Sequence, residues 1–467
     1  MGNYTITYLL IKLLKIINHQ KYVKLFGTDG IRGKANTYPI TAEIALKLGK
    51  AAAKVLGKRN KPIFIIGKDT RLSGYMLENG LTAGLTSMGA DVFLVGPMPT
   101  PALAHLVRSF NADAGIMISA SHNPYTDNGI KFFDSNGLKL ADDIEAEIEK
   151  NVFLDITTEH VDSIKIGRAY RIEDARGRYI EFAKASINNT SLKGLKIVID
   201  CANGAAYKVA PDILKELGAE VIILNNEPDG NNINLDCGAL HPEVIKKAVI
   251  KYGADCGISL DGDADRIIMA DENGEVLDGD YLLAITGIDF LKRNKLSKKT
   301  IVVTEYTNLA FDELIKKNNG SVVRVKNGDR YVIEEMQKSG YNVGGESSGH
   351  IIFSDFNCTG DGMIAGLQVL KIMKEKSMAL SKLNQLKKYP QVIINVNVNE
   401  KKPLEKMKKV QEEIKKANNE LGKIGRHLIR YSGTEMKCRV MIEGKDKVMI
   451  EKIASRISEE IKKEVGR

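Results

Sequence analysis

The chain has 467 residues, of which 43% are hydrophobic and 27% are charged. These values are ordinary for a soluble globular protein, and the length allows about three or four domains. The net charge of +9 comes partly from lysines in helix-like stretches such as residues 401–420, without interleaved aromatic residues. This pattern predicts a solvated lysine face, so we expect small anions and no nucleic acid as partners.

The first 22 residues form an apolar run that Lys12 and Lys15 interrupt. The run is too short and too charged to span a bilayer, and it lacks the small residues of a signal-peptide cleavage site. We therefore expect an N-terminal extension, no membrane partner and a cytoplasmic location. The five scattered cysteines agree with a reducing compartment, and Cys237 with His241 lacks the second pair of ligands that a zinc site needs.

Short β-branched runs alternate with glycine-bearing turns and helix-like stretches along most of the chain. This alternation predicts α/β layers with mixed, mainly parallel sheets. From about Lys388 the pattern changes to one typical of a small α+β domain with antiparallel strands. The β-branched runs lie within residues 62–74, 90–97, 195–204, 219–226, 254–265, 300–308 and 321–329.

The chain also contains an internal repeat. Residues 87–96 resemble residues 216–225, and residues 112–119 resemble residues 254–261. The offset of about 130 to 142 residues predicts duplicated α/β domains. The polar segments after the second pair, 119–123 and 261–265, would then end equivalent strands, at the sheet edge where α/β proteins bind ligands.

The segment DGDADR places Asp261, Asp263 and Asp265 in one tight turn. Three carboxylates this close repel one another unless a cation or strong donors neutralise them, and oxygen ligands suit Mg²⁺. An EF-hand loop is disfavoured because Arg266 stands where that loop needs glycine. The simpler alternative is a solvated acidic turn.

Ser121 lies in Ser-Ala-Ser-His-Asn, directly after a predicted buried strand. A hydrolase nucleophile is disfavoured because the G-x-S-x-G pattern is missing. A phosphorylated serine could share a cation with the aspartate turn, since phosphate oxygens are strong ligands. The alternative is a small residue that ends a strand. Further segments combine glycines with groups suited to anions or sugars, namely Arg32, Lys68, Arg71, Glu346, Ser348, His350, Arg430, Ser432, Gly433, Thr434 and Arg439.

Five motifs, in this order, resemble the α-D-phosphohexomutase superfamily. They are FGTDGIRG (26–33), SASHNP with NGIKFF (119–133), DGDADR (261–266), GGESSGH (344–350) and RYSGTE with RVMIEG (430–444). Within the superfamily, residues 168–184, 199–211, 231–243 and 325–332 are most similar to bacterial phosphoglucosamine mutases. The resemblance covers nearly everything from about Lys24 onward.

The resemblance implies three related α/β domains and a smaller C-terminal α+β domain around a central cleft. It also implies a phosphorylated Ser121 flanked by His122, with Lys131 and Arg32 assisting proton transfer. Because Arg32 is close, we expect Lys131 to have a lowered pKa. The domains expected after the extension at 1–22 are 23–165, 166–265, 266–385 and 386–467.

The same resemblance implies one Mg²⁺ per chain, held by phosphorylated Ser121, Asp261, Asp263 and Asp265. The implied substrate-binding residues are Arg266, Asp329, Arg330, Glu346, Ser348 and His350. The implied phosphate-binding residues are Arg430, Ser432, Gly433, Thr434 and Arg439.

The implied activity is that of an isomerase, an intramolecular phosphotransferase, which interconverts glucosamine 6-phosphate and glucosamine 1-phosphate through a 1,6-bisphosphate. Such a reaction would supply UDP-N-acetylglucosamine and cell-wall precursors, with a hexose 1,6-bisphosphate as activator. A phosphomannomutase or phosphoglucomutase of the same mechanism is the nearest alternative, and a non-catalytic sugar-phosphate-binding homologue is another. Whether the chain forms a homodimer is left open.

Three residues depart from the phosphoglucosamine mutase pattern. Ser347 stands where glutamine is usual, Met436 where proline is usual, and Asn327 where valine is common. None of them is a residue expected to carry the chemistry. The strictness of the sugar preference is therefore left open.

Overall fold

The computed structural model describes residues 24–27, 29–154, 159–422, 424–432 and 436–466. The predicted N-terminal extension at 1–22 lies outside these residues. The chain divides into two compact units, which are described separately below. They are Met1–Val276 with His350–Lys374, and Leu277–Gly349 with Glu375–Arg467.

The first unit begins with a six-stranded sheet in the order β1-β5-β4-β2-β3-β6. Strand β2 is parallel to β3 and β4, whereas β5 is antiparallel to β1 and β4. The sheet is therefore mixed, with its parallel strands in the buried centre. Its strands are β1 (Ile31–Lys34), β2 (Ile63–Lys68), β3 (Asp91–Pro97), β4 (Ala114–Ile118), β5 (Asp127–Phe133) and β6 (Ala169–Arg171).

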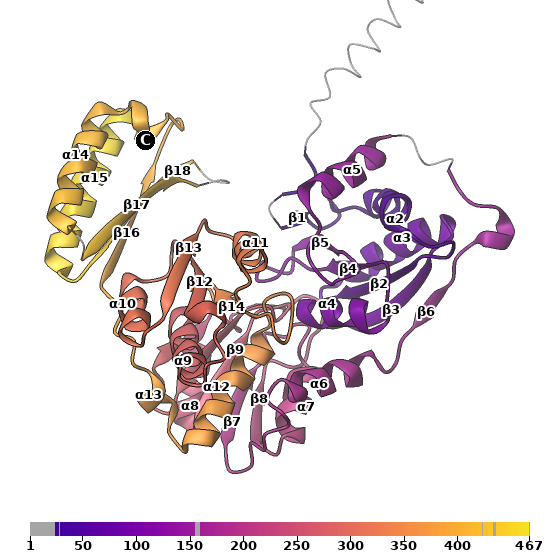
Figure 1. The fold of residues 1–467 in the computed structure, drawn as a ribbon. Helices are drawn as coiled ribbons and strands as arrows, with labels where there is room; N and C mark the ends of the chain where they lie inside the picture. The colour runs from indigo at the N-terminus through magenta and orange to yellow at the C-terminus, as the bar shows by residue number, and fades with distance from the viewer. Residues whose placement is uncertain (1–23, 28, 155–158, 423, 433–435, 467) are drawn as a thin grey trace, which may run out of the picture. The chain divides into compact units, whose positions relative to one another are not determined.

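Helices cover both faces of this sheet, with α2, α3 and α5 on one face and α4 on the other (Figure 1). Helix α2 begins after Thr41, whose side chain accepts the N–H of Ile44 and satisfies a donor that the helix itself cannot. Because helices pack on both faces of the sheet, every residue of the central strand β4 is buried. The helices are α2 (Ala42–Leu56), α3 (Ser73–Ser87), α4 (Thr100–Ser109) and α5 (Asp142–Phe153).

A second sheet in the same unit has the order β11-β10-β9-β7-β8. Its order β9-β7-β8 matches β4-β2-β3, and β10 is antiparallel to β9 as β5 is to β4. The predicted repeat is therefore present in three dimensions. The elements of this half are α6 (Ala175–Ala185), β7 (Lys196–Asp200), α7 (Val209–Glu216), β8 (Glu220–Leu224), α8 (Pro242–Tyr252), β9 (Cys256–Leu260), β10 (Ile267–Asp271), β11 (Val276–Leu277) and α12 (Gly362–Lys376). Strand β15 (Ile351–Phe353) is instead the edge strand of a third sheet, in the order β13-β12-β14-β15.

The sheets extend past two of the expected domain boundaries. Strands β10 and β11 belong to the second sheet, although they follow the expected end of domain II at Asp265. Strand β6 belongs to the first sheet, although it follows the expected end of domain I at 165. We propose that domain I continues to about Arg171 and domain II to about Leu277.

In the second unit, β12 is parallel to both β13 and β14. The order β13-β12-β14 repeats the orders β8-β7-β9 and β3-β2-β4. A third copy of the same arrangement therefore precedes the loop that begins at Glu346. The elements are α9 (Gly279–Lys292), β12 (Thr300–Thr304), α10 (Leu309–Lys317), β13 (Ser321–Val325), α11 (Asp329–Ser339), β14 (Val343–Gly345) and α13 (Leu380–Leu383).

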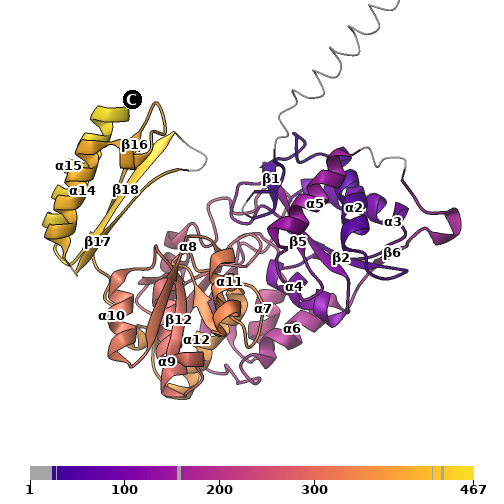
Figure 2. The same cartoon turned by 45° about the horizontal axis from the view of Figure 1, so that its top comes forward.

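The C-terminal part of this unit is a three-stranded antiparallel sheet in the order β16-β18-β17. Helices α14 and α15 lie side by side on one face of it (Figures 1 and 2). This arrangement confirms the predicted small α+β domain. Its elements are β16 (Gln391–Asn397), α14 (Lys408–Leu421), β17 (Gly425–Tyr431), β18 (Lys437–Gly444) and α15 (Lys447–Val465). Across the described residues of the whole chain, none of the helices has the length and apolar character needed to cross a membrane.

A half-buried histidine makes the stability of the first unit depend on pH. His105 of α4 stacks on Phe182 of α6, with 3.8 Å between ring centroids. Burial, with Arg108 and Arg178 nearby, lowers the pKa of His105 from 6.5 to about 4. Between these two values the unfolded chain binds a proton that the folded chain does not bind, so stability falls as the pH decreases from 6.5 toward 4.

We expect His105→Gln to reduce the loss of thermal stability between pH 6.5 and pH 4.5, while changing it little above pH 7. Melting curves recorded across this range test the effect. Exposed His160 offers a control, because His160→Gln should leave the pH dependence as it is. An unchanged slope in His105→Gln would contradict the assignment.

Candidate active site

Two antiparallel strands position Ser121 and Lys131. Strand β4 ends at Ile118, and its neighbour β5 carries Lys131 opposite Met117. The chain leaves β4, forms the loop that contains Ser121 and returns along β5, and both side chains contact the acidic turn, Ser121 at Asp261 and Lys131 at Asp263. Arg32 of β1 lies opposite Gly129 of β5, one strand further along the same sheet edge.

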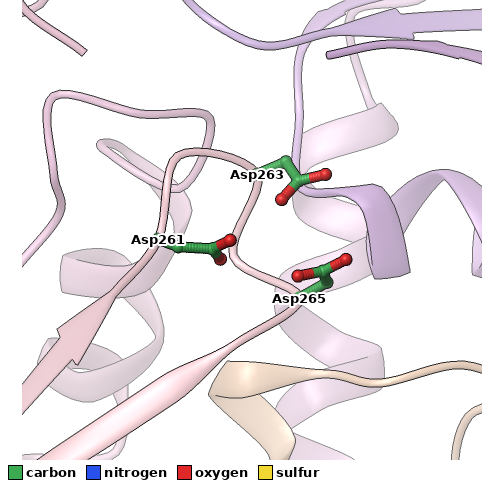
Figure 3. A group of neighbouring side chains, drawn as sticks. All are labelled: Asp261, Asp263 and Asp265. Atoms are coloured by element: carbon green, nitrogen blue, oxygen red, sulfur yellow. The ribbon is translucent and has the colours of Figure 1, made fainter. Parts of the chain in front are cut away.

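The acidic turn is the equivalent loop of the second sheet. Leu260 of β9 pairs with Ile267 of β10, so the intervening residues form a tight hairpin. Asp261, Asp263 and Asp265 alternate along it, and their carboxylates turn toward one another (Figure 3). One oxygen from each lies within 4.8 Å of the others, and all three residues are buried.

The three buried carboxylates repel one another. Burial, followed by the charges of Asp265 and Asp263, raises the pKa of Asp261 well above its usual range. One oxygen of Asp263 and one of Asp265 are buried and accept no hydrogen bond from the described part of the chain. Buried oxygens without donors, in a group that repels itself, are what a hard divalent cation would satisfy.

The Ser121 loop and the acidic turn meet directly. The Oγ atom of Ser121, a residue 1% exposed, donates to Oδ2 of Asp261 at 2.7 Å. The approach depends on Gly262, because a Cβ atom there would lie 2.6 Å from the carbonyl oxygen of Ser121 and 2.7 Å from Nδ2 of Asn234. The predicted partnership between these two loops is thus a contact in the structure.

Lys131 is the cation of this group. Its Nζ atom lies 3.0 Å from Oδ2 of Asp263, 3.7 Å from Oδ2 of Asp265 and 3.4 Å from Oδ2 of Asp29. Burial opposes its charge, but these carboxylates outweigh burial and raise the pKa of Lys131. The expected lowering of this pKa is therefore wrong for the metal-free chain, because three acids face the amine and Arg32 is a minor influence.

Asp29 organises the cations at the edge of the site. It pairs with Arg32, with Lys131 and with Lys139, whose Nζ lies 2.5 Å from its Oδ1. Burial raises the pKa of Asp29, but the three cations hold it well below its usual range. Arg32 also lies 3.5 Å from the carbonyl oxygen of Ala120, so it borders the Ser121 loop.

His122 accepts a hydrogen bond at Nδ1. Its Nδ1 atom lies 3.2 Å from a guanidinium nitrogen of Arg266 and 3.3 Å from Oγ of Ser121. A guanidinium can only donate, so Nδ1 is the acceptor. Burial, with Arg266 and Arg32 nearby, lowers the pKa of His122 to about 4, so the ring is neutral near pH 7.

His350, expected among substrate-binding residues, is 2% exposed and faces the acidic turn. Its Nε2 accepts the N–H of Gly360 at 3.2 Å, which leaves the ring proton of the neutral form on Nδ1. Nδ1 lies 3.7 Å from Oδ2 of Asp265. In this geometry His350 orients a carboxylate, as partners of metal ligands commonly do.

In the second unit, Glu346 brings two predicted substrate-binding segments together. Its Oε1 accepts the N–H of Gly328 at 3.0 Å, at the beginning of α11, where Asp329 and Arg330 follow. Its Oε2 accepts the hydroxyl of Ser348 at 3.0 Å. Arg330 donates through Nε to Glu334 at 2.9 Å. Glu346, Ser348 and the first turn of α11 therefore lie side by side.

The predicted phosphate-binding residues lie on the C-terminal sheet. Arg430 of β17 and Arg439 of β18 are directly opposite each other in the register. Like charges at opposite positions destabilise a strand pair, which favours an anion between them. Ser432 lies at the end of β17 and donates its N–H to Lys437 at 2.8 Å. Gly433 and Thr434 lie outside the described residues.

Sequence reasoning missed Asp29 and Thr100, and it expected Arg71 and Lys68 to contact anions. Asp29 lies in the segment FGTDGIRG, three residues before Arg32. Thr100, the first residue of α4, donates its hydroxyl to Oδ2 of Asp263 at 2.6 Å, and no sequence signal could have indicated this contact. Arg71, grouped with anion-binding residues, is instead buried against Asp69. Lys68, of the same group, pairs with buried Glu78 at 2.6 Å.

Four family models match the chain in order, and together they cover most of its length. They describe the α/β/α domains I, II and III and the C-terminal domain of phosphoglucomutase/phosphomannomutase, at residues 23–158, 177–274, 278–389 and 393–460. The chain belongs to the phosphoglucomutase/phosphomannomutase family. The predicted superfamily, fold class and enzyme class, an isomerase, are confirmed.

Curated relatives in this family align along nearly their whole length. The phosphoglucosamine mutase of Pelobacter propionicus is 51% identical over 452 residues, which cover 95% of this chain and 99% of the relative. The phosphoglucosamine mutase of Geobacter metallireducens is 52% identical with the same coverage.

Among solved structures, a phosphoglucomutase/phosphomannomutase family protein from Burkholderia thailandensis has a TM-score of 0.78 at 24% identity, covering 94% of this chain and 97% of its own. The N-acetylphosphoglucosamine mutase of Aspergillus fumigatus, in complex with GlcNAc-6P and magnesium, has a TM-score of 0.65 at 21% identity, covering 94% and 95%. At these identities both structures support the fold alone.

We expect Gly262→Ala to separate the two loops of the site. The added Cβ would overlap the carbonyl of Ser121, and overpacking of this kind costs about 1–3 kcal/mol. Gly177→Ala is a matched control, because a Cβ there, on helix α6, meets nothing within 4 Å. Urea unfolding of the first unit should show a lower midpoint for Gly262→Ala only, and equal midpoints in the two variants would contradict the steric argument.

Proposed function

We propose that the chain interconverts glucosamine 6-phosphate and glucosamine 1-phosphate, through phosphorylated Ser121 and a glucosamine 1,6-bisphosphate. The observation that carries the proposal is the Ser121 hydroxyl, buried 2.7 Å from Asp261 in a cluster of three carboxylates. The curated relatives at 51–52% identity over nearly the whole chain support the choice of amino sugar. The product would feed UDP-N-acetylglucosamine and cell-wall precursor synthesis.

The reaction consists of two phosphoryl transfers. In the first, O1 of glucosamine 6-phosphate attacks the phosphorus on Ser121, the bond between Oγ and phosphorus breaks, and the proton of the sugar hydroxyl is released as Oγ becomes a hydroxyl. The bisphosphate then turns end over end. In the second, Oγ of Ser121 attacks the 6-phosphate and frees O6, which takes up a proton. The products are glucosamine 1-phosphate and phosphorylated Ser121.

The residues around Ser121 are suited to hold charge and protons in these steps. Lys131 is a buried cation, held in that state by the carboxylates around it, and can stabilise the transferring phosphoryl group. Arg32 borders the same loop and adds a second positive charge. The Nδ1 atom of His122 carries no proton and can accept a hydrogen bond, and the ring is uncharged at pH 7.

The three aspartates fit a resident Mg²⁺. They supply oxygen ligands only, two of their buried oxygens have no hydrogen bond from described residues, and their mutual repulsion calls for a divalent cation. When bound, Mg²⁺ would supply positive charge that stabilises the transferring phosphoryl group. His350 would orient Asp265, and Thr100 would orient Asp263.

The second unit carries further residues that we propose to bind sugar and phosphate. Glu346 and Ser348 offer a carboxylate and a hydroxyl for sugar hydroxyls, beside Asp329 and Arg330 at the first turn of α11. The opposed Arg430 and Arg439 would bind the phosphate that is not being transferred, together with Ser432. Gly433 and Thr434, which follow Ser432 in the sequence, are proposed to bind the same phosphate. Arg266, in the first unit, would complete substrate binding beside His122.

Escape of the bisphosphate would leave Ser121 without its phosphate and the chain inactive. We therefore propose a hexose 1,6-bisphosphate as the activator that restores it. The five free cysteines support a reducing, cytoplasmic location. We also propose that the chain forms a homodimer.

Ser121→Ala should abolish turnover of glucosamine 6-phosphate, because no other oxygen occupies its place against Asp261. The assay uses purified protein, Mg²⁺ and glucose 1,6-bisphosphate, with product followed by ³¹P NMR. Ser87→Ala serves as the control, since its hydroxyl only bonds to the carbonyl of Gly84 in α3. Residual turnover by Ser121→Ala above about a thousandth of the wild-type rate would refute the phosphoserine route.

The same assay identifies the preferred sugar phosphate. Glucose 6-phosphate and mannose 6-phosphate are run beside glucosamine 6-phosphate at equal concentrations, and we expect the highest kcat/KM for the amino sugar. Higher values for mannose or glucose phosphate would keep the mechanism and assign the chain to the phosphomannomutase or phosphoglucomutase reaction. No turnover of any of the three would leave a sugar-phosphate-binding protein.

Removal of the metal should destabilise the chain as well as stop catalysis. At 100 times its dissociation constant, Mg²⁺ is expected to stabilise the folded state by about 2.7 kcal/mol. Asp261→Asn should lose this gain and yet melt no lower than the metal-free wild type, because it removes one of three repelling carboxylates. Asp174→Asn, on the surface of α6, should keep the gain. A Mg²⁺-induced rise in melting temperature in Asp261→Asn equal to that of the wild type would count against the site.

A further inference from the structure

The loop that carries Ser121 has a backbone that its own sequence does not favour. Ser121 has φ of 52°, in the left-handed region that L-residues other than asparagine and aspartate seldom adopt. Such a conformation persists only where surrounding groups hold it. The groups that hold Ser121 in this conformation are therefore part of the site.

Arg71 provides part of the support. It follows β2, and its side chain is fully buried. One guanidinium nitrogen donates to the carbonyl of Ser121 at 2.9 Å and to that of Asn123 at 2.8 Å, and the other donates to the carbonyl of Pro124. Asp69 accepts the Nε–H at 2.8 Å and balances the charge. One planar group thus occupies three carbonyls of the loop.

Asn234, which belongs to the domain of the second sheet, donates hydrogen bonds to two of the same carbonyls. Its Nδ2 donates to the oxygens of Ser121 at 2.9 Å and Asn123 at 3.1 Å. Asn234 lies between β8 and α8, and its own N–H donates to the carbonyl of Ala202 at 2.9 Å. The carbonyl of Ser121 therefore accepts hydrogen bonds from both domains that meet at the site.

The backbone N–H of Ser121 is also held by a hydrogen bond. The N–H of Ser121 donates to Oγ of Ser119 at 2.9 Å, and that hydroxyl donates to Oδ2 of Asp69 at 2.6 Å. Both peptide groups that flank Ser121 are thereby fixed. With them fixed, the Cα–Cβ bond of Ser121 has a fixed direction, and Oγ reaches Asp261 from it by its own hydrogen bond.

We propose that Arg71 and Asn234 are positioning residues, which hold the Ser121 loop so that Oγ, or the phosphate on it, faces the three aspartates. Neither residue contacts Oγ, and Asp69 neutralises Arg71, so both act through geometry and not through charge on the phosphate. The inference deepens the proposed function and rests on it for its consequence in catalysis. The loop contacts themselves stand independently of it.

The test combines hydrogen exchange with kinetics on the full chain. Asn234→Ala removes the side-chain amide that donates to the loop. Arg71→Lys keeps the positive charge but loses the planar guanidinium that donates to three carbonyls. Asn231→Ala, at an exposed position, is the control. Exchange is followed by mass spectrometry on peptides spanning residues 115–133, without substrate. Turnover of glucosamine 6-phosphate is measured with Mg²⁺ and glucose 1,6-bisphosphate.

We expect faster exchange confined to this loop in Asn234→Ala, and kcat lower by about 10- to 100-fold with KM nearly unchanged, because misplacement of the reacting atom affects the chemical step most. Arg71→Lys should act in the same direction and more strongly. If Arg71→Lys does not fold, Asn234→Ala alone decides.

Exchange in the loop equal to that of the control, or an unchanged kcat, would overturn the proposal. A purely structural defect would lower melting temperature and active fraction without a selective change in loop exchange, and this outcome also overturns it. Wild-type protein that turns over no sugar phosphate would refute the proposed function, whereas the exchange data would still decide the role of Arg71 and Asn234.

Discussion

Mutual repulsion among Asp261, Asp263 and Asp265 is the constraint on which the site depends. Three buried carboxylates within 4.8 Å of one another cannot all ionise without compensation. Lys131 compensates part of the charge and is itself held as a cation by the same carboxylates and by Asp29. The two remaining buried oxygens mark where further positive charge is needed. The raised pKa of Lys131 and the fit to Mg²⁺ follow from these neighbouring charges, and the raised pKa of Asp261 follows from its burial together with them.

The fold supplies this arrangement by repetition. The orders β3-β2-β4, β8-β7-β9 and β13-β12-β14 each place a parallel strand at the same position in a sheet. The loop after the third strand in each copy carries a different chemistry, namely Ser121 after β4, the aspartates after β9 and Glu346 after β14. A duplicated scaffold can therefore specialise one loop per copy while the buried strands keep the same packing. Ligand sites at the carboxyl edges of such sheets follow the general rule for open α/β folds.

Some functional assignments depended on neighbours that come from distant parts of the chain. Arg71 in GKDTRLSG has the composition of an anion contact, yet it is buried with Asp69 and holds carbonyls of the Ser121 loop. His350 lies in a glycine-rich polar motif typical of sugar binding, yet it faces Asp265. Lys131 lies near Arg32 and was expected to have a lowered pKa, yet Asp263, Asp29 and Asp265 outweigh that neighbour. In each example the residue type was correct for a functional region, and its partner determined its role.

The sequence alone determined the α/β repeat, the antiparallel C-terminal domain and the acidic turn. These features are local, since they rest on strand periodicity, on turn residues and on charges a few positions apart. The importance of Ser121 followed from the resemblance to the α-D-phosphohexomutase superfamily, which rests on five motifs in order along the chain. Tertiary structure alone decided the contact between Ser121 and Asp261, the opposition of Arg430 and Arg439, and the support of the loop by Arg71 and Asn234. The reason is physical: pKa values and side-chain roles are set by desolvation and by charges within a few ångströms. Residues that are distant in the chain, such as Ser121 and Asp261, become such neighbours only when the sheets have packed.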